Sequence, residues 1–168
     1  MSSGEFLTRS SIWIALICYF VVASGQFACR ASKHSCAGWL RLVWTIGCIA
    51  YLGHVFCAFH VYHNWSHAEA YRYTAQETNG MIGLDWGGGL YLNYLFTLLW
   101  ITDAVWWWRD RERYRHRSRL VSGFLHGFLF FMVFNATVVF GVGLIRWFGL
   151  GGCLSVAFFA CIHRPRPQ

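Results

Sequence analysis

Charge is the property that this sequence has least of. Only 12% of its 168 residues are Asp, Glu, Lys or Arg, whereas 57% are hydrophobic and 20% are aromatic. A soluble domain of this length needs more charged side chains to cover its surface. The composition therefore excludes an ordinary soluble globular domain and indicates an integral membrane protein.

Several motifs that carry chemistry are also absent. The seven cysteines include no C-x-x-C pair, so neither a zinc ribbon nor a disulfide framework is predicted. No nucleotide-binding motif is present, because the glycine run at 87–89 has no lysine after it and follows no predicted strand. No internal repeat or long linker divides the chain. Residues 1–168 are therefore predicted to form a single polytopic membrane domain.

The most informative stretch that is present runs from Trp106 to Arg119. It joins three consecutive tryptophans to a block of six arginines. Tryptophan favours the headgroup layer, and an excess of Lys and Arg marks the cytoplasmic side of a membrane. Residues 109–119 are therefore predicted to form a cytoplasmic loop. Nine of the fourteen basic residues lie at 30–41 and 109–119, a pattern that indicates topology and lipid contact, with no nucleic-acid partner.

Five apolar stretches approach the roughly 20 residues that a helix needs to cross the hydrocarbon layer. They are residues 11–29, 38–62, 90–108, 120–140 and 144–162. The predicted fold is an all-α bundle of five transmembrane helices in an inner or plasma membrane, with the N-terminus outside and one sizeable external loop at 63–89. Because Arg146 and three glycines interrupt the last stretch, the alternative is four spans followed by a C-terminal re-entrant or interfacial segment.

The two ends of the chain fit the five-span topology. Residues 1–25 resemble a secretory signal, since Arg9 precedes an apolar run that ends in small residues. A cleaved signal would leave the arginine block outside, so this run is predicted to stay as the first span. A fifth span returns Arg164 and Arg166 to the basic side of the membrane.

Three of the eight histidines, His60, His63 and His67, are spaced at i, i+3 and i+7. If the second span continues as a helix to about Thr78, they share one helix face at the outer membrane surface. Two imidazoles one turn apart can chelate a transition metal, although His60 and His67 lie about 10 Å apart along the axis. The hypothesis is a metal site at these three residues. The alternative is an amphipathic belt in the headgroup layer.

A bis-histidine haem within one subunit is disfavoured by the depths of the histidines. Haem b needs two axial imidazoles at matching depth on facing helices. Counted from the basic ends of the spans, His126 lies about 9 Å deep, His54 about 20 Å and His60 about 29 Å. A haem with one ligand from this chain, or one shared by two subunits, remains as an alternative.

Two sets of polar residues are predicted inside the membrane. Asp103 and His126 lie five and six residues from the inner ends of their spans, so they share a depth and could pair, which a carboxylate in hydrocarbon requires. His54, Asn93 and Asn135 form a second layer about 20–23 Å from the inner surface. These groups either line a path for protons or substrate, or join the helices through hydrogen bonds.

Three functions are therefore considered. The sequence favours a non-catalytic structural or accessory subunit, partnered by another membrane protein or a second copy of itself, because it shows no catalytic pattern. The first alternative is a metal- or haem-binding redox protein that uses the external histidines. The second is a small proton-coupled carrier or channel that uses Asp103 and His126.

Overall fold

The computed structural model describes residues 3–31 and 37–162, and no strand occurs among them. The helices are α1 (Ser3–Ala31), α2 (Ala37–Tyr62), α3 (His67–Ile82), α4 (Gly89–Arg109), α5 (Arg111–Arg115), α6 (Arg119–Phe134) and α7 (Leu144–Ile162), and a π-helical turn, η1 (Asn135–Val139), prolongs α6. The all-α bundle predicted from composition is confirmed. Arg164 and Arg166, like Lys33 in the first basic loop, lie outside the described residues.

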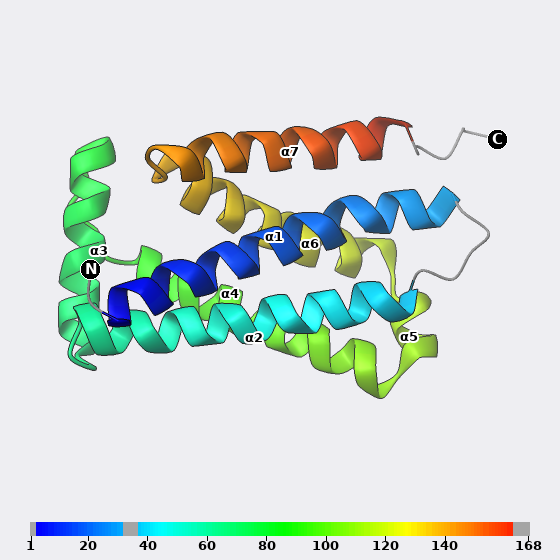
Figure 1. Ribbon diagram of the computed structural model, residues 1–168, viewed down its shortest axis with the longest axis horizontal. Helices are drawn as coiled ribbons and strands as arrows, with labels where there is room; N and C mark the ends of the chain where they lie inside the picture. Colours follow the sequence, from blue (N-terminus) through cyan, green and yellow to red (C-terminus); the bar gives the residue numbers. More distant parts are fainter. Residues whose placement is uncertain (1–2, 32–36, 163–168) are drawn as a thin grey trace.

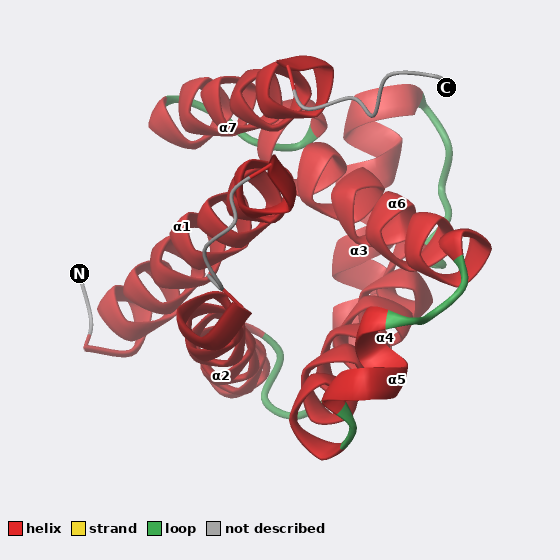
Figure 2. Ribbon diagram, turned by 90° about the vertical axis from the view of Figure 1, so that its right-hand side faces the viewer, coloured by secondary structure: helices red, strands yellow, loops and turns green. Residues whose placement is uncertain are grey.

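The long helices run side by side. Figure 1 shows α1, α2, α4, α6 and α7 along the long axis of the molecule, with α3 across one end and α5 at the other. Viewed along this axis in Figure 2, the order around the bundle is α1, α2, α4, α6 and α7, and α7 packs back against α1. Each long helix therefore packs against the helices on either side of it and leaves one side facing outward.

Four helical segments are long and apolar enough to cross a membrane: Ser3–Cys29, Gly38–Tyr62, Arg119–Val139 and Leu144–Ile162. The last of them is the stretch for which the sequence left a re-entrant segment open, and it is one continuous helix of 19 residues. α4 is not in this set. Its 21 residues extend for about 32 Å, but they include many Tyr and Trp together with Asn93 and Asp103. The five-span topology therefore depends on whether α4 crosses.

An aromatic cluster fills the centre of the bundle around Trp100, which is 2% exposed. Its ring stacks on Tyr51 at a centroid distance of 5.6 Å and contacts Trp44 at 4.9 Å. Tyr19 and Phe96 meet the same indole edge-on. One side chain of α4 thus packs against both α1 and α2.

Glycines let α7 approach its neighbours closely. A Cβ atom on Gly149 would overlap the side chain of Thr137 in η1, and one on Gly152 would overlap the ring of Phe20 in α1. The hydroxyls of Ser155 and Ser24 lie 3.1 Å apart between α7 and α1. Such close contact of small residues is the usual way in which helices associate in lipid, where no hydrophobic effect drives them together.

Gly149→Val should lower the free energy of unfolding by about 1–3 kcal/mol, because the new methyl groups would be forced against Thr137. Gly151→Val is the matched control on the same helix, since a Cβ atom there meets nothing within 4 Å. Unfolding of both variants in detergent micelles, followed by circular dichroism, measures the difference. Equal unfolding midpoints would contradict the close approach of α7 to η1.

The continuous helix that the sequence predicted from the second span to about Thr78 is wrong, because the chain turns after Tyr62. Asn64 and Trp65 adopt left-handed backbone, with φ of 46° and 59°, and Ser66 then caps α3 through its hydroxyl. Asparagine tolerates this conformation and serine is a strong N-cap. The segment after α2 is therefore a separate helix, α3, which lies across the end of the bundle (Figure 1).

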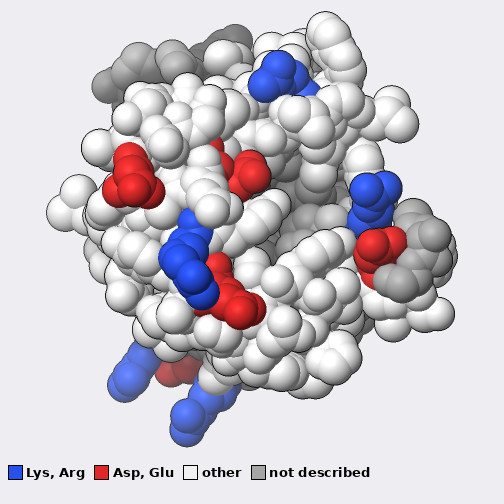
Figure 3. All heavy atoms as spheres, turned by 90° about the vertical axis from the view of Figure 1, so that its left-hand side faces the viewer, with Lys and Arg blue, Asp and Glu red and all other residues white. Residues whose placement is uncertain are grey.

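The two ends of the bundle differ in charge. Figure 3 views the α3 end, where acidic and basic side chains are mixed; α3 and the loop after it contribute Glu69, Arg72, Glu77 and Asp85. The opposite end carries α5 and the block of six arginines. The excess of positive charge is thus confined to one end of the molecule among the described residues.

Candidate functional site

Asp103 lies fully buried, with 0% exposure, in the half of α4 that approaches α5. Its Oδ1 atom accepts a hydrogen bond from Nη1 of Arg117 at 2.7 Å, and its Oδ2 atom accepts one from the Tyr114 hydroxyl at 3.1 Å. The Arg117 side chain is only 8% exposed. Each oxygen of this buried carboxylate therefore has a donor, and its charge is paired with a buried guanidinium.

Arg117 also reaches His126 on α6. Its Nη2 atom lies 2.6 Å from Nε2 of the imidazole. Because a guanidinium can only donate, Nε2 must accept, which assigns a neutral imidazole with its proton on Nδ1. Trp44 packs edge-on against the same ring at 6.3 Å. One guanidinium thus joins α4, the turn before α6, and α6 itself.

Tyr114 holds the short helix α5 beneath this network. Its ring stacks on Trp107 with centroids 4.8 Å apart, and the Arg117 guanidinium lies over the Tyr114 ring, 4.1 Å from the ring centre. Burial, followed by the nearby charge of Asp103, raises the pKa of Tyr114 well above its ordinary value. The hydroxyl therefore keeps its proton and donates to the carboxylate. Asp110 begins α5 by accepting a hydrogen bond from the backbone of Arg113.

The structure brings Asp103 and His126 together, but it does so through Arg117. The sequence predicted this arginine only as part of the cytoplasmic basic loop at 109–119, and not as a site residue. One signal pointed toward it: a carboxylate inside a membrane requires a cation, and the arginine block begins six residues after Asp103. That signal could identify the block, but it could not identify which arginine folds back.

The three histidines of the predicted metal site have separate partners. His60 accepts a hydrogen bond from the indole of Trp65 at 3.3 Å, and His67 lies 3.0 Å from the Tyr94 hydroxyl. His63 packs against two aromatic rings. Because α2 ends before His63, the three do not share one helix face. In the described ranges no three His, Cys, Asp or Glu side chains gather as a metal ligand set, so the structure does not support the metal hypothesis.

The second predicted polar layer serves separate elements. Nδ1 of His54 lies 2.9 Å from the backbone carbonyl of Thr8, which ties α2 to α1. The Asn135 amide donates to the carbonyl of Phe131 within its own helix at 2.8 Å. Asn93 is exposed on α4. These contacts hold helices locally and do not continue the network around Asp103.

Comparison with known proteins gives no further guide to this site. No protein-family model, curated protein or solved structure matches the chain. The chemistry of the site is therefore argued from its own geometry.

The network around Asp103 is closed. The carboxylate is bonded on both oxygens at 2.7 and 3.1 Å. The Asp103 side chain is 0% exposed, and that of its partner Arg117 is 8% exposed. In the conformation described, these groups connect α4, α5 and α6, so the network serves to hold these helices together.

Proposed function

We propose that this protein is a multi-pass membrane protein that acts as a non-catalytic structural or accessory subunit, with α4 as the third of five spans. The observation that carries the proposal is the state of Asp103, which is fully buried and bonded on both oxygens. A carboxylate that moves protons or binds substrate faces a cavity or a water path. Asp103 instead fixes the α4–α5–α6 turn.

The distribution of charge supports the proposed orientation. The arginine block at the α5 end fits the cytoplasmic surface, where Lys and Arg accumulate. The α3 end, with its mixed charges (Figure 3), fits the outer surface. With five spans, the N-terminus then lies outside, and α3 lies along the outer face of an inner or plasma membrane.

The outward faces of the helices support a role inside a bilayer, next to lipid or another membrane subunit. α7 exposes several large apolar side chains, among them Leu144, Trp147, Leu154 and Phe158, each more than 60% accessible. Gly149 is the one residue of α7 that is buried in the described structure. Helices in lipid associate by close van der Waals packing, and this face is available to a neighbouring helix.

Proteoliposomes separate the accessory role from a proton-coupled carrier. Purified protein is reconstituted into vesicles that contain a pH-sensitive dye, and a pH gradient of one unit is imposed. We expect the gradient to decay at the rate of empty vesicles, because the Asp103 network offers no open proton path. Asp103→Asn and the surface control Glu112→Gln, whose native side chain is 78% exposed, should give the same rate. A faster decay that Asp103→Asn abolishes and Glu112→Gln retains would replace the proposal with a carrier or channel.

A further inference from the structure

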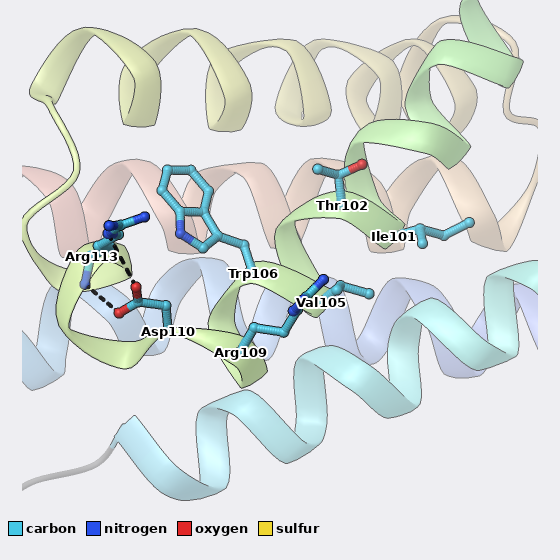
Figure 4. Close-up of a pocket in the computed structure, with 7 residues that line it drawn as sticks. All are labelled: Ile101, Thr102, Val105, Trp106, Arg109, Asp110 and Arg113. Atoms are coloured by element: carbon cyan, nitrogen blue, oxygen red, sulfur yellow. Dashed lines mark hydrogen bonds and ion pairs between the residues drawn. The ribbon is translucent and has the colours of Figure 1, made fainter.

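A groove on α4, where this helix meets α5, takes no part in the Asp103 network. Its volume is about 610 Å³. One part is mainly apolar and the other is charged. The groove is lined by Ile101, Thr102, Val105, Trp106, Arg109, Asp110 and Arg113. Figure 4 shows these side chains on α4 and on the first turn of α5. The groove therefore combines a hydrophobic floor with a polar rim.

The polarity of the groove changes along the axis of α4. Ile101, Val105 and Arg109 are spaced four residues apart, so they lie in a row on one side of the helix. At 1.5 Å per residue, Ile101 is about 12 Å further from the α5 end than Arg109. Because α4 runs along the long axis of the bundle (Figure 1), the groove passes from apolar to basic in the direction from the membrane interior to its surface. A phospholipid has the same order of acyl chain and phosphate.

The rim has an excess of positive charge. Asp110 forms an ion pair with Arg113, whose Nε lies 3.3 Å from Oδ2, and this arginine side chain remains 84% exposed. Arg109 is exposed beside them. The one carboxylate and two guanidiniums of the rim sum to a net charge of +1, and guanidinium groups match phosphate oxygens in bidentate geometry. Trp106 is held at the same level by an edge contact with Tyr114, with ring centroids 5.9 Å apart.

We propose that this groove binds an anionic phospholipid. Its phosphate lies on Arg109 and Arg113, and one acyl chain follows Ile101 and Val105. The proposal rests on the placement of α4 across the bilayer in the proposed function. It does not depend on whether the protein is an accessory subunit or a carrier. The proton-flux assay therefore tests the accessory role, and the lipid assay tests the groove.

Native mass spectrometry of the delipidated full chain tests this site. The protein is titrated with phosphatidylglycerol and with phosphatidylcholine of the same acyl composition, and phosphatidylglycerol should bind more tightly. Arg109→Gln and Arg113→Gln should each weaken phosphatidylglycerol binding about fivefold, the effect of one basic residue near an anionic lipid. Arg115→Gln is the matched control, because this exposed arginine belongs to the same block but does not line the groove.

Two further measurements distinguish a lipid from its headgroup. Val105→Trp fills the apolar floor without changing charge, and it should weaken phosphatidylglycerol binding. Glycerol phosphate at the same concentration should not displace the lipid. Equal affinity for the two lipids, an Arg115→Gln loss as large as that of Arg109→Gln, or displacement by glycerol phosphate would each overturn the proposal.

Discussion

Replacing Asp103 with alanine is expected to lower the free energy of unfolding by about 3–5 kcal/mol, the usual cost of breaking a buried ion pair. The Arg117 guanidinium, 8% exposed, would be left without its carboxylate, and the Tyr114 hydroxyl would lose its acceptor. Reversible unfolding in mixed micelles, followed by circular dichroism, gives the free energy of the variant and of the wild type.

A double variant separates the charge from the packing. Asp103→Leu combined with Arg117→Met should recover most of the lost stability, because apolar residues of similar volume often replace a buried ion pair at little cost. Such a recovery would indicate that the ion pair adds little to the free energy of unfolding, and that its main effect is to determine which arginine packs against α4. A wild-type unfolding midpoint for Asp103→Ala alone would contradict the burial of this ion pair.

The aromatic centre should be equally sensitive. Trp100→Ala is expected to lower the free energy of unfolding by about 3–5 kcal/mol, because it leaves a large cavity among side chains of three helices. Trp147→Ala on α7 is the control: its side chain is 72% exposed, and its removal should change stability by less than about 0.5 kcal/mol. The same micelle unfolding experiment compares them, and equal losses would show that the indole of Trp100 does not support the bundle.

The helices themselves could be predicted from the sequence because a chain in lipid must satisfy its own backbone hydrogen bonds. The predicted stretch 144–162 coincides with α7, and 38–62 nearly coincides with α2. The first helix begins earlier than the predicted span, at Ser3, and its first turns carry several polar side chains. The hydroxyls of Ser10 and Ser11 donate to carbonyls four residues before them. The length of an apolar stretch does not reveal polar helical turns that precede it.

The candidate site could be predicted only in part. The depth of a residue along a helix can be counted from the sequence, and this count predicted the same membrane depth for Asp103 and His126. The missing element was α5, a helix of five residues inside a charged block, which has no apolar periodicity to predict it. The position of α5 decides that Tyr114 and Arg117 turn inward while their neighbours stay exposed. The shared helix face predicted for His60, His63 and His67 was wrong for a similar reason, since the turn after Tyr62 depends on two residues with left-handed backbone.

The ion pair between Asp103 and Arg117 has a consequence for the order of assembly. The two residues are 14 positions apart, and the loop that joins them is short, so the entropy lost in closing it is small. The hairpin of α4, α5 and α6 can therefore neutralise its own buried carboxylate without help from α1, α2 or α7. In the proposed five-span topology, this hairpin would enter the bilayer as one unit that already contains its counterion, and the remaining helices would then pack around it.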